Sequence, residues 1–249
     1  MVKVNYIGRL GNQLFQYCFG RIMAEETGMR LCASPIPGFP GTQAAVNGRV
    51  ATSPNHTTYS ENVIVDFDAE IRFYKSSDIP VIVSAYMQRY EYYKKHREKI
   101  RSWLAVQPID DPPGPNDLVI HVRLGDFVHH RRVLAQSYIH DVLKERDRYQ
   151  NVWIVTDEPF SSYFHGFSGI KFYRGLDHMS DFRFIMSAKN IVLSASTFCW
   201  WAACLSNAEK VLFPVISKDV FWWNSICGRN PVDLWVPDSS FKAVVADLL

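Results

Sequence analysis

The sequence lacks a hydrophobic run long enough to cross a bilayer, and its first residues are not expected to act as a secretory leader. The apolar stretches at 191–193 and 200–203 fall well short of the roughly 20 residues that a membrane-spanning helix needs. Residues 1–7 alternate as a short strand does and carry no apolar core or cleavage site. We therefore expect no integral membrane segment, and the sequon Asn55-His56-Thr57 carries little weight without secretion.

An excess of charge of one sign is also missing. The 27 Lys and Arg residues oppose 25 Asp and Glu, a formal charge of +2 over 249 residues, which excludes nucleic-acid binding through bulk electrostatics. The five cysteines are odd in number and lack C-x-x-C spacing, so we expect reduced, buried thiols in a reducing compartment and no zinc. With 47% hydrophobic and 21% charged residues, the chain is typical of a globular protein with one large or two modest cores.

Strand-like and helical segments alternate along the chain, which predicts parallel α/β layers. The first strand leads through the glycine loop Gly8–Gln13 into a helix. This loop is not G-x-G-x-x-G, and its glycines are either only steric or bring helix N–H groups to an anion or a sugar. The proline-rich segment 107–116 cannot continue a helix or a central strand, so it predicts a linker between domains at 1–107 and 117–249.

Weaker patterns predict further local structure. The alternating residues 63–67 indicate a strand edge, which accounts for the metal-like triplet Asp66-Phe67-Asp68 without a metal. Three helices are expected, at 91–104, at about 137–149, and after a cap at Ser180 or Asp181. A final strand at 211–213 ends before Pro214, and an aromatic segment then leads to a short terminal helix.

The most informative stretch is 119–127, an apolar strand whose end carries His121, Arg123 and Asp126. Gly125 is expected to let the chain turn sharply there. Ligands of open α/β sheets bind at this carboxyl edge, and an arginine fork suits the paired oxygens of a phosphate. The stretch therefore predicts a diphosphate site, and the alternative is a structural ion pair between Arg123 and Asp126.

Two later strands also end in polar residues. The strand at 152–157 ends in Asp157, which either recognises a base or ribose or caps the following turn. The strand at 191–193 runs into Ser194, Ser196 and Thr197 before an aromatic helix. Their hydroxyls and the helix amides either cradle an anion or serve only as an N-cap beneath a buried tryptophan pair.

Taken together, four segments resemble the α-1,2-fucosyltransferase family, which carries G-G-L-G-N-Q-hydrophobic-F-Q-Y, Y-x-Q-x-x-x-Y/F, H-x-R-x-G-D-Y/F and S-S/T-F-S/C-W-W-A in this order. Here the motifs read Gly8–Tyr17, Tyr86–Tyr92, His121–Phe127 and Ser196–Ala202. The resemblance is weaker between Cys32 and Ile79, where this chain is short for the family, and at Arg9, Leu124 and Cys199.

The resemblance implies a GT-B fold, in which two Rossmann-like domains face a cleft. Residues 1–107 would form the acceptor-side domain, and residues 117–249 would bind GDP-fucose. The implied reaction is inverting transfer of L-fucose from GDP-β-L-fucose to a glycan hydroxyl, O-2 of a galactoside, with no metal and no other cofactor. Charge builds on the leaving diphosphate in such a transfer, and preorganised donors can stabilise it in place of a metal.

Carried over by position, the resemblance assigns catalytic roles to Arg123, Asp126 and Asn12. Arg123 would grip the GDP phosphates, and Asn12 would touch fucose or the β-phosphate. Asp126 is the candidate general base for the acceptor hydroxyl, although it would equally serve to orient Arg123.

The donor-binding residues follow in the same way. His121 would lie near the nucleotide, and Asp157 would read guanine or ribose. The diphosphate would be cradled by Ser194, Ser196 and Thr197, with Gly11 beside Asn12 in the donor site.

Two other functions fit the same motifs. A related glycosyltransferase could use another GDP-sugar or build another linkage, because contacts with the phosphates and guanine do not distinguish one sugar from another. A nucleotide- or glycan-binding module without catalysis is the second. The expected partners are GDP-fucose and a glycan acceptor, including a lipid-linked one met at the cytoplasmic membrane face, and the expected location is the cytoplasm.

Overall fold

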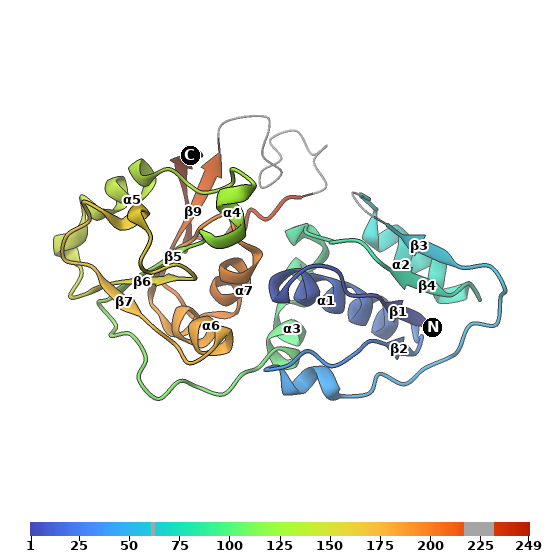
Figure 1. Cartoon of the computed structure of the whole chain (residues 1–249). Coiled ribbons are helices and arrows are strands. Elements are labelled where there is room, and N and C mark those ends of the chain that lie inside the picture. The colour runs from blue at the N-terminus through green and yellow to red at the C-terminus, as the bar shows by residue number, and fades with distance from the viewer. Residues whose placement is uncertain (61–62, 217–231) are drawn as a thin grey trace. The chain divides into compact units, whose positions relative to one another are not determined.

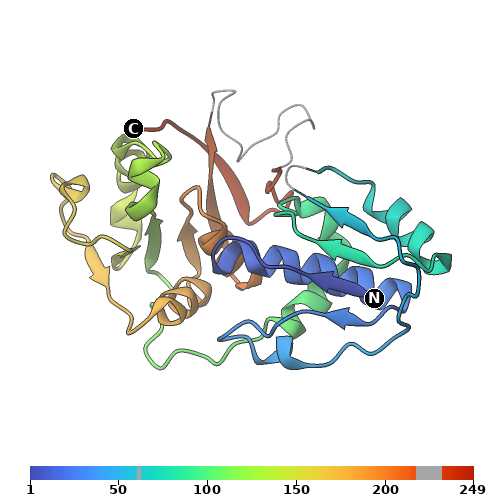
Figure 2. The ribbon, with the colours of Figure 1, turned by 45° about the vertical axis from the view of Figure 1, so that its right-hand side comes forward.

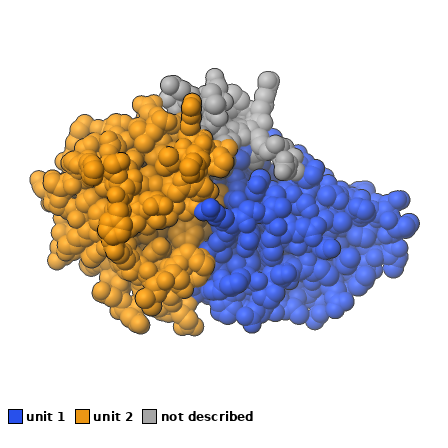
Figure 3. All heavy atoms as spheres, in the orientation of Figure 1, with its two compact units in different colours: residues 1–106, 225–234 blue, residues 107–224, 235–249 orange. Residues whose placement is uncertain are grey.

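The computed structural model describes residues 1–60, 63–216 and 232–249 (Figure 1). The chain divides into two compact units, coloured separately in Figure 3: unit 1 holds residues 1–106 and 225–234, and unit 2 holds residues 107–224 and 235–249. Each unit contains its own parallel sheet, so the protein has a mixed α/β architecture. Across the described ranges, no helix combines the length and apolar character that crossing a membrane requires.

Unit 1 is built on a parallel sheet of four short strands in the order β2-β1-β4-β3. The strands are β1 (Val2–Val4), β2 (Leu31–Cys32), β3 (Thr57–Tyr59) and β4 (Val81–Val83). Val2 lies between Leu31 and Val81 in the register, which places β1 in the middle of the sheet. Valine side chains suit such a position because β-branched residues pack well on a pleated, buried surface.

Two helices cross from strand to strand in unit 1. Helix α1 (Leu10–Thr27) joins β1 to β2, and α2 (Phe67–Ser76) joins β3 to β4. Both crossovers step along the sheet in the same direction, so right-handed connections place both helices on one face, where they pack together. A Cβ on Gly20 would lie 2.4 Å from Cγ2 of Val4, so this glycine lets α1 pass close over β1.

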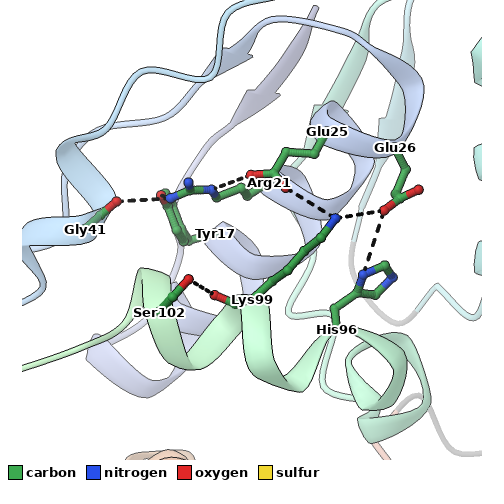
Figure 4. A network of polar contacts seen from close by, with 8 residues as sticks. All are labelled: Tyr17, Arg21, Glu25, Glu26, Gly41, His96, Lys99 and Ser102. Atoms are coloured by element: carbon green, nitrogen blue, oxygen red, sulfur yellow. Dashed lines mark hydrogen bonds and ion pairs between the residues drawn. The ribbon is translucent and has the colours of Figure 1, made fainter.

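The nearly buried Arg21 ties α1 to its neighbours (Figure 4). Its Nε donates to Glu25 at 3.0 Å, and its Nη1 donates to the Tyr17 hydroxyl at 2.8 Å and the Gly41 carbonyl at 3.0 Å. Gly41 lies in η1 (Pro40–Gln43), and Lys99 of α3 (Arg97–Trp103) reaches Glu25 at 3.6 Å. Arg21 and Glu25 therefore hold together three segments that are far apart in the sequence.

Two expectations for unit 1 are wrong. Asp66 is the N-cap of α2, where its Oδ1 accepts from Ala69 N at 2.9 Å, so residues 63–67 are not a strand edge. An aspartate cap followed by acidic residues in the first turn favours a helix start. The helix expected over 91–104 is broken into η2 (Tyr90–Tyr92), η3 (Lys94–His96) and α3. The break falls where the buried Tyr93 hydroxyl donates to the carbonyls of Phe15 and Met87.

Unit 2 is built on a six-stranded parallel sheet in the order β10-β9-β8-β5-β6-β7. The strands are β5 (Leu118–Val122), β6 (Val152–Thr156), β7 (Lys171–Tyr173), β8 (Asn190–Val192), β9 (Lys210–Ile216) and β10 (Phe241–Ala246). Every residue of β5 is buried, as expected of a central strand in a parallel sheet that is covered on both faces.

The helices of unit 2 show where its strand order reverses. From β5 the chain moves through α4 (Gly125–His129) and α5 (Gln136–Leu143) to β6, and later returns through α6 (His178–Ser187) to β8 on the other side of β5. Helix α7 (Thr197–Leu205) then leads to β9. Because right-handed crossovers change face when their direction changes, α5 covers one face of the sheet, and α6 and α7 cover the other (Figures 1 and 2). The carboxyl ends of β5 and β8 form the topological switch point of unit 2.

Two helix predictions in unit 2 need correction. The helix expected to Tyr149 ends at Leu143 and is followed by η4 (Arg146–Arg148). The cap of α6 is Asp177, whose Oδ1 accepts from Ser180 N at 2.7 Å, and not Ser180 or Asp181. A side-chain oxygen three residues before the N–H that it accepts is the usual N-cap geometry, and Asp177 supplies it.

The expected end of the last strand and the terminal helix are also wrong. Strand β9 continues through Pro214, and β10 pairs with it in parallel, with Pro214 opposite Val244. Strand β8 ends opposite Leu212, so β9 has no partner strand on that side at position 214. The missing backbone N–H of Pro214 therefore costs no hydrogen bond with β8. The aromatic segment expected after Pro214 falls mainly on residues 217–231, outside the described residues.

Candidate functional site at the carboxyl edge of the sheet in unit 2

A buried hydrogen bond joins the two sides of the switch point. His121 near the end of β5 places its Nδ1 2.7 Å from Oγ of Ser194, which follows β8. The two residues are only 6% and 4% exposed. This contact links β5 to the loop after β8. The sheet order reverses between these two strands, and ligands of open α/β sheets bind at such a position.

His121 is neutral at physiological pH. Burial lowers its pKa to about 4, against the opposing influence of the negative charge on Asp157. A neutral imidazole has one donor and one acceptor nitrogen, and the partner of one nitrogen fixes the role of the other. Within the described part of the chain, Nε2 of His121 makes no hydrogen bond, so this nitrogen keeps its bonding capacity for a ligand.

The loop after β5 carries an arginine between two carboxylates. Nη2 of Arg123 lies 2.5 Å from Oδ1 of Asp126, and Nη1 lies 2.8 Å from Oδ2 of Asp157. The structural ion pair considered from the sequence is therefore present. These contacts use only some of the hydrogen-bond donors of the guanidinium, which has five N–H groups in a fixed fork. Arg123 can still donate to a further anion.

Asp157 fixes the shape of this loop. Its Oδ1 accepts from the backbone N–H of Leu124 at 3.0 Å while its Oδ2 pairs with Arg123. A Cβ on Gly125 would lie 2.4 Å from that Oδ2. The chain turns from β5 into α4 at this point, and Gly125 begins α4 without a left-handed φ. Glycine is required here because the carboxylate of Asp157 approaches closely.

The start of α7 lies beside Ser194 in the same loop. Ser196 is the N-cap residue, but its hydroxyl makes no cap hydrogen bond, so the simple N-cap alternative is wrong. The first turn, beginning at Thr197, holds no acidic residue, whereas α6 starts with a capping Asp177 and with Asp181. The start of a nine-residue helix without a negative group favours an anion through its N–H groups and its dipole.

Unit 1 contains a second polar cluster, at the start of α1. Asn12 accepts at its Oδ1 a 2.8 Å hydrogen bond from Nε2 of Gln88. Gly8 has φ +75°, and a Cβ there would lie 2.2 Å from Nδ2 of Asn12. Gly11 is buried one residue before Asn12. Sequence patterns alone predict no role for Gln88, although its place in the Tyr86–Tyr92 motif is the available signal.

The backbone around Gln88 is held from both sides. Met87 has φ 53°, an uncommon conformation for a residue other than glycine, and its carbonyl accepts from the Tyr93 hydroxyl at 2.6 Å. Asp233 donates its N–H to the Gln88 carbonyl at 2.9 Å and accepts at its own carbonyl from Tyr90 N at 2.8 Å. These contacts fix the direction in which the Gln88 amide points.

The predicted site residues thus fall into two groups. Contacts or shared loops bring together seven of them in unit 2: His121, Arg123, Asp126, Asp157, Ser194, Ser196 and Thr197. Gly11 and Asn12 belong to unit 1. Among the described residues, no three or more His, Cys, Asp and Glu side chains are grouped so as to hold a metal ion.

These features define an α/β protein with two parallel sheets and polar clusters beyond the carboxyl ends of their strands. No protein-family model matches the chain, and a search of curated proteins finds no match either.

Proposed function

We propose that this chain is an inverting glycosyltransferase of the GT-B type, which transfers L-fucose from GDP-β-L-fucose to a glycan hydroxyl, O-2 of a galactoside. The observation that carries the proposal is the His121–Ser194 hydrogen bond across the switch point, with Arg123 in the adjoining loop. Open α/β sheets bind nucleotides at such a position. The choice of fucose and of the α-1,2 linkage rests on the resemblance of the four motifs to the α-1,2-fucosyltransferase family.

The donor groups in unit 2 suit a departing diphosphate. The fork of Arg123 matches paired phosphate oxygens, and the start of α7 adds N–H groups and the hydroxyls of Ser196 and Thr197. Such donors stabilise the charge that develops on the leaving phosphate, so the proposed reaction proceeds without a metal. Removal of one donor of this kind costs about 10²- to 10³-fold in rate.

The neutral His121 adds a directional donor to this arrangement. If the Ser194 hydroxyl donates to Nδ1, the proton of the imidazole resides on Nε2, which then donates to a phosphate oxygen. The hydrogen-bond partner of a histidine fixes its tautomer in this way at many functional sites. Ser194 would thus act through His121 and not on the substrate itself.

The acceptor hydroxyl must lose a proton as its oxygen attacks the anomeric carbon from the side opposite to the diphosphate. Asp126 is the proposed proton acceptor, since its carboxylate lies next to Arg123 at the start of α4. Asn12, oriented by Gln88, is proposed to contact fucose or the β-phosphate. The proposed location is the cytoplasm, in keeping with the free thiols of Cys32 and Cys199, and the proposed acceptors include lipid-linked glycans.

The test is release of GDP from GDP-fucose, with GDP-mannose beside it, in EDTA and over a panel of β-galactoside acceptors. We expect acceptor-dependent release from GDP-fucose alone, reduced at least about 100-fold in Arg123→Ala. Arg123→Lys should lose nearly as much, because lysine keeps the charge and lacks the fork. Arg148→Ala is the matched control, since Arg148 is an exposed arginine of unit 2 that pairs with Glu145.

Three outcomes would contradict parts of this proposal. Equal release from GDP-mannose would indicate an enzyme with another donor preference. Release that disappears in EDTA and returns with a divalent ion would refute the metal-independent mechanism. Binding of GDP through Arg123 without turnover of any donor would favour a nucleotide-binding module.

A further inference from the structure

Among the described residues, the two most exposed large hydrophobic side chains lie in neighbouring loops of unit 2. Leu176 is fully exposed, and Phe160 is 84% exposed. Phe160 follows β6 and Leu176 follows β7, and these strands pair in parallel, so both loops leave the carboxyl edge of the sheet. Single exposed hydrophobic residues are common on protein surfaces. Two in adjacent loops, at the edge where open α/β sheets bind their ligands, indicate a contact surface.

An arginine lies over the Phe160 ring. Cζ of Arg174 is 4.6 Å from the centroid of this ring, which is the geometry of a cation–π contact. Arg174 comes directly after β7, and within the part of the chain that the structure describes it forms no ion pair. The ring is 84% exposed despite this contact, so most of its surface is open to a ligand.

The strand order of unit 2 indicates which part of a nucleotide would reach these loops. Counted along the chain, the strands from β7 to β10 have the order 3-2-1-4-5-6 of dinucleotide-binding sheets, in which β5 is the first strand and β6 the second. In such sheets the diphosphate lies after the first strand, and an acidic residue further along the chain holds the ribose. Arg123 after β5 and Asp157 after β6 match these positions. The base would then lie beyond Asp157, over the loops after β6 and β7.

Phe160 is close enough to the anion-binding groups for one nucleotide to contact both. It comes three residues after Asp157, and three residues of extended chain span at most about 11 Å. Asp157 in turn pairs with Arg123 at 2.8 Å. A carboxylate can accept hydrogen bonds from the polar edge of a base, but only a flat apolar group such as the Phe160 ring can cover the face of the base.

We propose that Phe160 and Arg174 form a stacking platform for the base of a nucleotide whose diphosphate binds at Arg123. This inference rests on the proposed function in taking the ligand of unit 2 to be a nucleoside diphosphate. The Phe160 ring stacks on the base, and Arg174 holds the ring in place and adds the attraction of a cation for an aromatic system. Two exposed side chains are too few for a specific protein interface, which buries at least about 1,000 Å².

Calorimetric titration of the protein with GDP, and separately with inorganic pyrophosphate, tests the inference. Phe160→Ala should weaken GDP binding about tenfold or more and leave pyrophosphate binding unchanged, because pyrophosphate has no base. Phe160→Trp should retain tight GDP binding, since another aromatic ring supplies the same kind of surface. Arg174→Ala should weaken GDP binding by about two- to fivefold. Phe73→Ala removes an exposed phenylalanine of unit 1 and is the matched control, with no change for either ligand.

Unchanged GDP binding by a folded Phe160→Ala variant, judged by near-UV circular dichroism, would overturn the inference. An equal loss of GDP and pyrophosphate binding would also overturn it, because the ring would then shape the anion site and not contact a base. Unchanged GDP binding together with weaker retention on vesicles of anionic lipid would show that the two loops contact a membrane instead.

The inference and the proposed function can fail separately. If Phe160→Ala loses affinity for GDP but not for pyrophosphate, while the wild-type protein consumes no GDP-fucose, the inference stands and the proposed function fails. If the wild-type protein transfers fucose and Phe160→Ala binds GDP as tightly, the proposed function stands and the inference fails. Failure of the wild-type protein to bind GDP would overturn both.

Discussion

The buried imidazole of His121 predicts a specific loss of stability in acid. Burial lowers its pKa from 6.5 to about 4, and the negative charge of Asp157 opposes this only in part. In the unfolded chain the same group titrates near its ordinary value of about 6.5. Between these two values the unfolded state binds a proton that the native state does not, so the free energy of unfolding falls as the pH falls.

The size of the effect follows from the gap between the two pKa values. A change from 6.5 to about 4 corresponds to roughly 3 kcal/mol, since a factor of ten in proton affinity is worth about 1.4 kcal/mol. This stability is fully present above about pH 6.5 and is lost progressively down to about pH 4. It is a sizeable part of the roughly 5–15 kcal/mol that stabilises a typical folded protein.

The assay is urea unfolding of the wild-type protein and of His121→Asn between about pH 7.5 and about pH 4.5. Asparagine keeps a polar atom near the Nδ1 position, within reach of Ser194, but does not titrate. We expect the wild-type protein to lose roughly 2.5 kcal/mol more than the variant over this range, because part of the effect lies below pH 4.5. His129→Asn, a change at an exposed histidine of unit 2, should follow the wild-type curve.

Equal acid sensitivity of the wild-type protein and His121→Asn would refute the reasoning. It would mean that the His121 imidazole is protonated in the native state near its ordinary pKa. A titration of the histidine ring resonances by NMR measures the same quantity directly. A His121 resonance that shifts with a midpoint near pH 6.5 would contradict the neutral, hydrogen-bond-donating role proposed for this side chain.

Two further predictions concern unit 1. Gly20→Ala should destabilise the protein by about 1–2 kcal/mol in denaturant unfolding, because the new Cβ would lie 2.4 Å from Cγ2 of Val4. This cost should exceed the gain from the better helix propensity of alanine. If the destabilisation of the double variant Gly20→Ala/Val4→Ala equals the sum of the two single effects, the contact is contradicted. Gln88→Glu replaces the amide that donates to Asn12 with a hydrogen-bond acceptor, so the side-chain amide of Asn12 should flip. The kcat for GDP-fucose transfer should then fall about tenfold or more, with little change in melting temperature. An unchanged kcat would show that the Gln88 amide is not needed.

The parts of the fold that depend on local sequence could be predicted. The apolar start of the stretch 119–127 does lie in a buried central strand, β5. A helix does follow the first strand, but it begins at Leu10, inside the segment Gly8–Gln13 that was expected to be a loop. Both predictions rest on patterns within one turn or one strand, where side-chain periodicity directly reflects burial. Alternation of strands and helices was enough to predict parallel sheets, because parallel strands need crossover connections.

The contacts that build the candidate site could not be predicted in the same way. His121 and Ser194 are 73 residues apart, and Asn12 and Gln88 are 76 residues apart. No periodicity links such pairs, which meet only because the sheet order places their strands side by side. The need for glycine at position 125 could not be predicted for the same reason, since the group that excludes a side chain there belongs to Asp157, just after the neighbouring strand β6.

The two edges of the sheet in unit 2 differ in how completely their polar groups are satisfied. At the amino edge, buried Asp117 accepts from Trp153 Nε1 at 2.9 Å, Asn151 Nδ2 at 2.9 Å and Gly114 N at 3.0 Å. Burial alone would raise the pKa of Asp117, but these hydrogen bonds prevail and lower it. Such a saturated carboxylate has a structural role.

At the carboxyl edge, by contrast, His121 retains an unused ring nitrogen in the described structure, and Arg123 retains donors beyond its two ion pairs. A fold usually satisfies its buried polar groups internally, because each unmet hydrogen bond costs about 1–3 kcal/mol. The ring nitrogen and the guanidinium donors at this edge, beside a helix start without an acidic group, are the groups that the proposed anion would use. This difference between the two edges supports the proposed anion site at the carboxyl edge independently of the sequence motifs, and calorimetric titration of the protein with inorganic pyrophosphate tests it without assuming a sugar.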